Sequence, residues 1–251
     1  MLNDLLLLSG TDIPFPQAQI TIHQPRIKEI SFIGEEAFFL GCEILNFSKD
    51  LLTTEDKTNL ENKTNFDVLM SIMRDNKNPA VQKNRICATM VLTLIFPDCK
   101  IHFNKDHIDI AEEGDLTKIH KIDNNNFEAF KEIIAEMFCL KHDIGNGPTY
   151  NPGGQRAAEI AAKLNKGRAA ASQAKGEQKK IAIISRYMSI LAIGNQQSFD
   201  SLCDYTVYQL FDSFNRFELK NNFDIYLKAK TAGAQDLKEV DNWMKDIHAE
   251  S

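Results

Sequence analysis

The sequence lacks several features that would place a protein in a membrane or secreted class. No apolar run reaches the roughly 18 to 20 residues that a membrane-spanning helix needs. The five cysteines, at positions 42, 87, 99, 139 and 203, are odd in number and widely spaced, which favours free thiols over a disulfide framework. The leucines Leu5–Leu8 follow an acidic residue, Asp4, with no basic residue before them, which is not the pattern of a signal peptide. We therefore predict a cytosolic protein that contacts no membrane.

Catalytic motifs are also missing. The stretch 145–154 is rich in glycine, but Gly154 is followed by Gln155 and Arg156 and not by the lysine and hydroxyl residue with which a P-loop holds phosphates. The carboxylate pairs Glu35-Glu36 and Glu112-Glu113 are adjacent in the chain, as on a solvated face or turn, and do not converge on a substrate. Sequence alone does not reveal a triad assembled from distant residues. We predict a protein that is not an enzyme and has no cofactor.

One group of residues has the side-chain types of a zinc site, namely Cys99, His102, His107 and His120. However, Cys99 and His102 are three residues apart on an expected strand, so their side chains point to opposite faces. No CxxC or HxxxH pair reinforces them. We predict that these residues bind no metal and that the histidines lie on the surface or in cross-strand pairs.

The composition is that of an ordinary globular protein, with 43% apolar residues, 25% charged residues and a net charge of -6. A chain of 251 residues buries roughly 70 to 75 per cent of its unfolded surface, so a substantial core is expected. The overall acidity argues against a dedicated nucleic-acid-binding protein.

Periodicity predicts an α+β domain over residues 1–144. A short strand at 19–23 precedes a helix that begins near Arg26, whose apolar residues recur every three or four positions up to Phe38. Three alternating runs then predict an antiparallel β-meander. The polar run 123–126 offers caps for a following helix. Further helices and the three strands are expected at 66–73, 81–96, 99–103, 107–111, 117–122 and 127–138.

Four glycines and two prolines between residues 145 and 154 indicate a linker, after which residues 155–251 are expected to form a helical domain. Expected helices there cover 181–193, the segment after the cap Ser198, the segment after the cap Thr206, and 237–247. We therefore expect a mixed N-terminal domain followed by a mainly α-helical C-terminal bundle.

The first helix of this second domain is basic. Residues 151–186 carry eight basic residues against two acidic ones. Such a helix could follow nucleic-acid phosphates, but no aromatic residue lies between 155 and 180 to stack on bases, which favours an acidic or helical protein partner. Trp243 and Met244 in the last helix are of the types that anchor adaptable interfaces. The candidate partner-binding residues are Arg156, Lys163, Lys166, Arg168, Trp243 and Met244.

Three stretches carry a family resemblance. These are 21–38 (TIHQPRIKEISFIGEEAF), 122–141 (IDNNNFEAFKEIIAEMFCLK), and a C-terminal group that contains SRYMSILAIG, YTVYQLFDSFNRF and AGAQDLKEVDNWMKDIH. Together they resemble the tail assembly chaperones of tailed bacteriophages, over most of the chain and without one diagnostic motif. The resemblance implies a non-enzymatic helper in the host cytoplasm that binds the tape-measure protein, or another tail protein, during tail morphogenesis. Some relatives also have a longer, frameshifted form.

Two alternatives remain open. A structural virion component, such as a tail, neck or baseplate subunit, would self-associate and stay in the particle. A DNA-associated protein would use the basic helix and lose its affinity steeply with salt.

Overall fold

The computed structural model describes residues 2–48, 62–74, 79–114, 118–140, 182–234, 240 and 242–244. The chain forms two compact units that do not follow sequence order. The first combines Met1–Lys141 with Ile184–Phe214, and the second combines His142–Ile183 with Asn215–Ser251. The predicted linker at 145–154 lies outside the described residues, so the predicted division there stays a prediction.

The first unit starts with a short helix and a hairpin. Helix α1 (Asp4–Ser9) is capped by Asn3, whose side chain accepts the Leu5 amide, and it buries Leu7. Strands β1 (Ile13–Phe15) and β2 (Ile20–Ile22) pair antiparallel around the 3-10 turn η1 (Pro16–Ala18). The buried Gln24 side chain donates to the carbonyl oxygens of Leu6 at 3.0 Å and of Thr11. These bonds fix α1 beside the hairpin.

Two helices replace the one expected from Arg26 onwards. Helix α2 (Ile27–Ile33) ends and α3 (Glu35–Leu45) begins at Gly34, which has φ +83° and ψ 147°. The prediction of a continuous helix to Phe38 was wrong here because this backbone conformation lies outside the helical region and suits glycine. The apolar spacing continues across the break: Ile27 and Ile30 of α2 and Phe38 of α3 are all buried in the first unit.

Helices α5 (Asn65–Arg74) and α6 (Pro79–Ile95) follow, and α6 packs against α3 over much of its length. Gly41 of α3 lies directly on α6, because a Cβ atom built there would overlap the carbonyl oxygen of Cys87. A glycine at the crossing therefore lets the two backbones approach closely.

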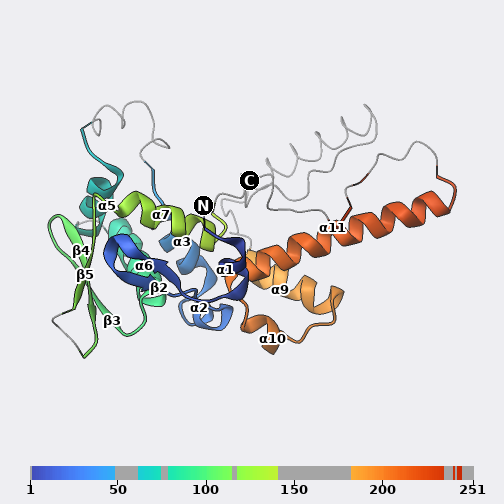
Figure 1. Cartoon of the computed structure of the whole chain (residues 1–251), viewed down its shortest axis with the longest axis horizontal. Coiled ribbons are helices and arrows are strands. Elements are labelled where there is room, and N and C mark those ends of the chain that lie inside the picture. The colour runs from blue at the N-terminus through green and yellow to red at the C-terminus, as the bar shows by residue number, and fades with distance from the viewer. Residues whose placement is uncertain are drawn as a thin grey trace. The chain divides into compact units, whose positions relative to one another are not determined.

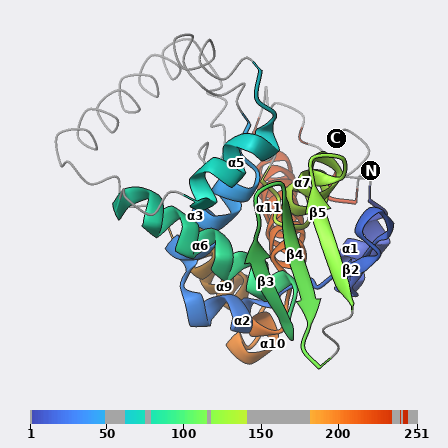
Figure 2. The same cartoon turned by 90° about the vertical axis from the view of Figure 1, so that its left-hand side faces the viewer.

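The three-stranded sheet has the predicted meander topology. Strands β3 (Cys99–Phe103), β4 (His107–Glu112) and β5 (Ile119–Asp123) pair antiparallel in the order β3-β4-β5. Ile108, Ile110 and Ile122 are fully buried on one face. Figure 2 shows α6 on the β3 side of this sheet and the β1–β2 hairpin on the β5 side, as their contacts also indicate.

Helix α7 (Phe127–Met137) carries the centre of the aromatic core. The Phe130 ring lies 6.1 Å from Phe15 and 6.2 Å from Phe96, measured between ring centroids. The predicted cap at 123–126 was wrong in its detail: the Asn126 side chain forms no cap bond with the helix. It instead accepts the Asp123 amide and donates to the Lys121 carbonyl oxygen, so it shapes the turn from β5 into α7.

Helices α9 (Ile183–Gly194), α10 (Phe199–Cys203) and α11 (Val207–Thr231) complete the described elements (Figure 1). Both predicted caps are confirmed. Ser198 accepts the Ser201 amide, and Thr206 and Gln209 accept each other's amides in a reciprocal capping box. The α+β class and the meander are thus confirmed, and every described element after β5 is a helix. None of the described helices is both long and apolar enough to cross a membrane.

Candidate partner-binding surface

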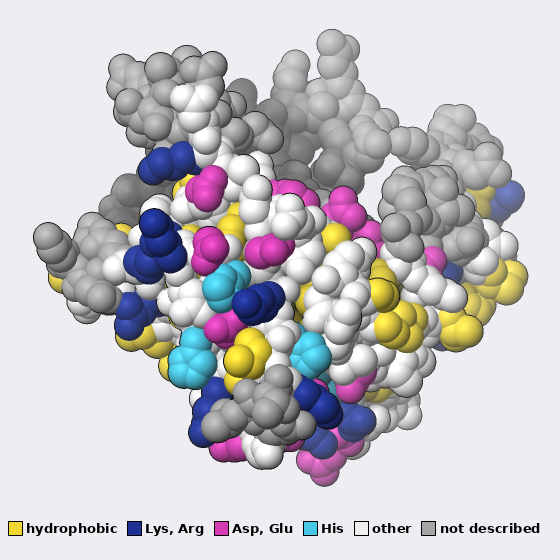
Figure 3. Space-filling model, turned by 60° about the vertical axis from the view of Figure 1, so that its left-hand side comes forward, with side chains coloured by type: hydrophobic (Ala, Val, Ile, Leu, Met, Phe, Trp, Pro, Cys, Tyr) yellow, Lys and Arg dark blue, Asp and Glu magenta, His cyan; other side chains and the backbone are white. Residues whose placement is uncertain are grey.

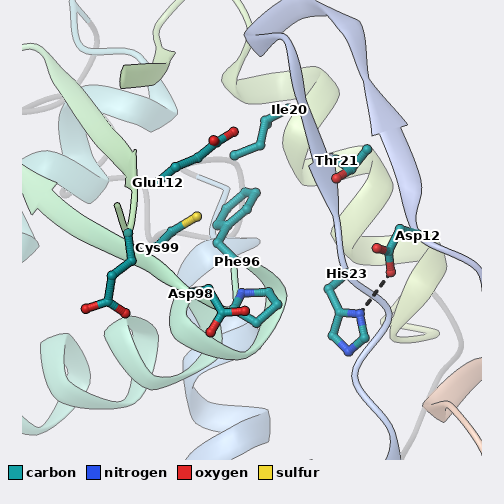
Figure 4. Close-up of a pocket in the computed structure, with 10 residues that line it drawn as sticks. Asp12, Ile20, Thr21, His23, Phe96, Asp98, Cys99 and Glu112 are labelled. Carbon is teal, nitrogen blue, oxygen red and sulfur yellow. Dashed lines mark hydrogen bonds and ion pairs between the residues drawn. The ribbon is translucent and has the colours of Figure 1, made fainter. Parts of the chain in front are cut away.

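The first unit contains an open pocket of about 300 Å³, between the β1–β2 hairpin and the β3–β4 end of the sheet (Figure 4). His23 Nδ1 lies 2.9 Å from Asp12 Oδ1 on the hairpin side. Asp98, Cys99 and Glu112 line the other side. Burial, helped by the nearby Glu112 and Asp98 carboxylates, raises the pKa of the Cys99 thiol. At neutral pH this sulfur is therefore protonated, a poor state for a nucleophile or metal ligand.

The strand register separates the residues of the possible zinc site. His102 pairs with Asp109 and Phe103 with the buried Ile108, so His102 faces away from the core. His107 lies on the same outer face and approaches Asp106 and Asp109, at 2.8 and 3.2 Å. His120 lies 3.1 Å from the Ala18 carbonyl oxygen. In the part of the chain that the structure describes, no group of three His, Cys, Asp or Glu side chains could hold a metal ion.

The face of the molecule seen in Figure 3 shows histidines interspersed with side chains of both charges. Ion pairs of the three-stranded sheet and its turns include Lys118 with Glu112 at 3.4 Å and Lys100 with Glu113 at 3.9 Å. All of these side chains except Glu112 are more than half exposed, so each pair contributes only about 0 to 1 kcal/mol. Among the described residues, the side chains seen on this face thus carry charges of both signs.

Residues 184–214 are fixed to the N-terminal part of the first unit through their helix ends. The Glu35 carboxylate accepts the Ile184 amide at 2.7 Å and the Ser185 hydroxyl at 3.1 Å. The Ile27 amide donates to the Tyr205 carbonyl oxygen at 2.8 Å, and Gln209 donates to Leu8 O at 2.7 Å. Between these contacts, the side chains of Ile184, Leu191, Leu202, Leu210 and Phe211 are buried.

The second unit presents a different surface. Helix α11 buries Val207, Tyr208, Leu210 and Phe211, all of which belong to the first unit. From Asn215 to the helix end at Thr231 no residue is buried, although this stretch continues to carry large apolar side chains. Ile225 is 56% exposed and Leu227 is 41% exposed. The apolar side chains of this stretch are Phe217, Leu219, Phe223, Ile225, Tyr226 and Leu227.

A turn at residues 242–244 belongs to the same unit and contacts this helix. The Arg216 guanidinium donates from Nη1 to the Trp243 carbonyl oxygen at 3.3 Å. The Met244 amide donates to the Asn242 side chain at 3.0 Å. Trp243 is 37% exposed and Met244 is 67% exposed. The structure therefore places two of the predicted binding residues, Trp243 and Met244, beside the start of the exposed stretch of α11.

We name residues 215–231 of α11 together with Trp243 and Met244 the distal surface. The other predicted binding residues, Arg156, Lys163, Lys166 and Arg168, lie outside the described residues, and so does most of the predicted helix 237–247. Leu219, Phe223, Ile225 and Leu227 were not among the candidate binding residues named from the sequence. The spacing of Leu219, Phe223 and Leu227 could have identified these three, because apolar residues four apart occupy the same side of a helix.

A family model matches part of the C-terminal region of the chain. Residues 175–248 match the model of the YomV second domain. YomV is a Bacillus prophage protein, so the match is to a phage-derived family and indicates a phage protein. The matched range contains α9, α10, α11 and the turn with Trp243 and Met244, whereas Arg156, Lys163, Lys166 and Arg168 precede it. No curated protein and no solved structure matches the chain.

Proposed function

We propose that this protein is a non-enzymatic tail assembly chaperone of a tailed phage. It binds the tape-measure protein, or another tail protein, in the host cytoplasm and keeps its apolar helices soluble until the tail is assembled. The single observation that carries the proposal is that the distal surface, which exposes Ile225, Leu227, Trp243 and Met244, falls within the match to a phage-derived domain. The resemblance of the whole sequence to tail assembly chaperones supports the same conclusion.

The chemistry of the distal surface suits such a role. A binding helper for apolar helices needs accessible apolar side chains along a rigid element, as in helix-in-groove recognition. Fully burying a side chain such as Leu or Ile in an interface contributes about 1.5 to 3 kcal/mol to the free energy of binding. The loss of translational freedom and the ordering of side chains on association offset much of this contribution. A few anchors of this size therefore give reversible binding, which a chaperone requires in order to release its client.

The first test is co-expression with the tape-measure protein of the same phage. The double variant Leu227→Ser/Met244→Ser removes two exposed anchors of the distal surface. The matched control is Phe32→Ser/Ile193→Ser, because those side chains are 90% and 83% exposed in the first unit. We expect the wild type and the control to keep the tape-measure protein in the soluble fraction, and the distal variant to lose most of it. Equal solubilisation by both variants would contradict this assignment of the surface.

The second test distinguishes a chaperone from a virion component. Mass spectrometry of purified particles should find this chain absent, whereas pull-down from the lysate should recover it with the tape-measure protein. Stoichiometric presence in particles would instead make it a tail, neck or baseplate subunit.

A further inference from the structure

Three neighbouring rows of residues on α11 define the chemistry of the distal surface. Residues four apart follow one another along one side of a helix, and two such rows adjoin where their members are three positions apart. One row is apolar and consists of Leu219, Phe223 and Leu227. The row on one side of it consists of Arg216, Lys220, Asp224 and Lys228, and the row on the other side of Glu218, Asn222, Tyr226 and Lys230. The apolar row therefore has four basic neighbours and two acidic ones.

The three lysines among these basic neighbours are available to a partner. Lys220, Lys228 and Lys230 are exposed. In the described part of the chain, none of them forms an ion pair with a carboxylate, and the Lys230 ammonium lies 5.6 Å from the centre of the Tyr226 ring. By contrast, Lys28, Lys83 and Lys118 of the first unit each pair with a carboxylate.

The helix dipole explains only part of this excess. Lys228 and Lys230 lie in the last turn, where positive charge is favourable next to the free carbonyl groups. Lys220 lies eleven residues before the end of the helix, beyond the reach of that effect, which falls off within the last turn. The helix dipole therefore does not account for Lys220.

We propose that the distal surface selects an amphipathic partner helix whose apolar stripe is flanked by aspartate or glutamate. This inference rests on the proposed function and specifies the chemistry of the client segment. The apolar row packs against the client's stripe, and Lys220, Lys228 and Lys230 face its carboxylates. A nucleic acid fits less well, because Asp224 lies between two lysines of the basic row and Glu218 lies in the row on the other side, so the positive charge is not continuous along the helix.

The probe consists of two fluorescent model peptides with one and the same apolar stripe, flanked by glutamates in one and by lysines in the other. Anisotropy titrations use the full chain at low and at high salt. We expect the glutamate peptide to bind about tenfold or more tightly than the lysine peptide at low salt, with the difference shrinking as salt screens the charges. Equal affinities, tighter binding of the lysine peptide, or no binding of either peptide would overturn the inference. So would single-stranded DNA that binds as tightly as the glutamate peptide.

Variants separate the charge from the apolar row. Lys220→Gln/Lys228→Gln should weaken binding of the glutamate peptide by about three- to tenfold, since exposed charge pairs are individually weak. The control Lys105→Gln/Lys121→Gln makes the same charge change on the exposed meander and should leave binding unchanged. Circular dichroism should show equal helix content in all variants. If the lysine variant still binds fully while Leu227→Ser/Met244→Ser loses the tape-measure protein, the charge inference fails and the proposed function stands.

Discussion

The carboxylate of Glu35, the first residue of α3, accepts the backbone amide of Ile184 at 2.7 Å and so caps the start of α9 from a position 149 residues earlier in the chain. The same carboxylate accepts the Ser185 hydroxyl at 3.1 Å. Amides at the start of a helix lack partners within it, so an external acceptor satisfies them. The Glu35 side chain thus links the start of α3 to residues 184–214.

Replacing this cap should destabilise the first unit. We expect Glu35→Ala to lower the free energy of unfolding by about 1 kcal/mol, the usual effect of losing a cap. Glu35→Gln keeps an acceptor oxygen and should therefore lower the free energy of unfolding by less than Glu35→Ala does. Urea denaturation followed by circular dichroism measures both. The control is Glu36→Ala, whose exposed pair with Lys83 should contribute little. A Glu35→Ala variant as stable as this control would contradict the role of the cap.

Gly41 should tolerate no larger side chain. A Cβ atom there would overlap the Cys87 carbonyl oxygen and approach Val91 Cγ2 on α6. Gly41→Ala therefore forces α3 and α6 apart and should cost about 1 to 3 kcal/mol, although alanine favours helices more than glycine does. Thermal denaturation should show a lower melting temperature. Glu43→Ala, at an exposed position of the same helix, serves as the control. An unchanged or higher melting temperature for Gly41→Ala would refute the close crossing.

The thiols should divide into two classes of reactivity. Cys42, Cys87 and Cys139 are buried, whereas Cys99 and Cys203 are partly accessible. Titration of the native protein with a thiol-reactive disulfide should modify Cys99 and Cys203 first. The three buried thiols should react at the rate of unfolding. Rapid modification of all five would mean that the core opens readily.

Alkaline pH should destabilise the fold. Burial, followed by the charge of Asp212, raises the pKa of Cys139 from 9.0 to about 12, and burial also raises that of Cys42. Above pH 9 the unfolded chain loses thiol protons that the folded chain retains. Stability from these groups is therefore complete below pH 9 and declines as pH rises towards 12. The midpoint of urea denaturation should fall as the pH is raised from 8 to 11. In the Cys139→Ala variant this midpoint should fall less steeply with pH.

The family-matched segment should not fold on its own. In residues 175–248 the buried side chains Leu191, Leu202 and Leu210 belong to the unit that includes Met1–Lys141. A peptide of this range should therefore show reduced helix content and no cooperative melting. Adding residues 1–141 in trans should restore part of the helix signal. A cooperatively folded peptide would instead make the segment autonomous.

Local signals predicted much of this fold because each depends on nearby residues. The alternation in 99–122 gave the meander, and Ser198 and Thr206 marked two helix starts that the structure confirms. The break at Gly34 was missed, since the apolar spacing runs through it and only the backbone conformation reveals it. The bond between Glu35 and Ile184 joins residues far apart in the chain, and no local pattern encodes it.

For the candidate site, the sequence identified the residue types of Trp243 and Met244 but not the hydrogen bond between Trp243 and Arg216 of α11. The apolar periodicity of α11 did not separate its covered part from its exposed part, because periodicity shows which residues share a side and not what covers them. Phe211 is the last buried residue of α11, although the helix continues to Thr231. That change comes from tertiary packing, which the sequence of one helix does not contain.

The order in which the first unit is completed has a kinetic consequence. Residues 1–141 are synthesised before Ile184. At about 5 to 20 residues per second, roughly 2 to 9 seconds pass between the synthesis of Lys141 and that of Ile184. During that interval the side chains that later cover Leu191, Leu202 and Leu210 have no partner, and Glu35 has no helix to cap. The nascent chain itself therefore passes through a stage in which it exposes apolar surface, and its own yield in the cell depends on how rapidly residues 184–214 dock.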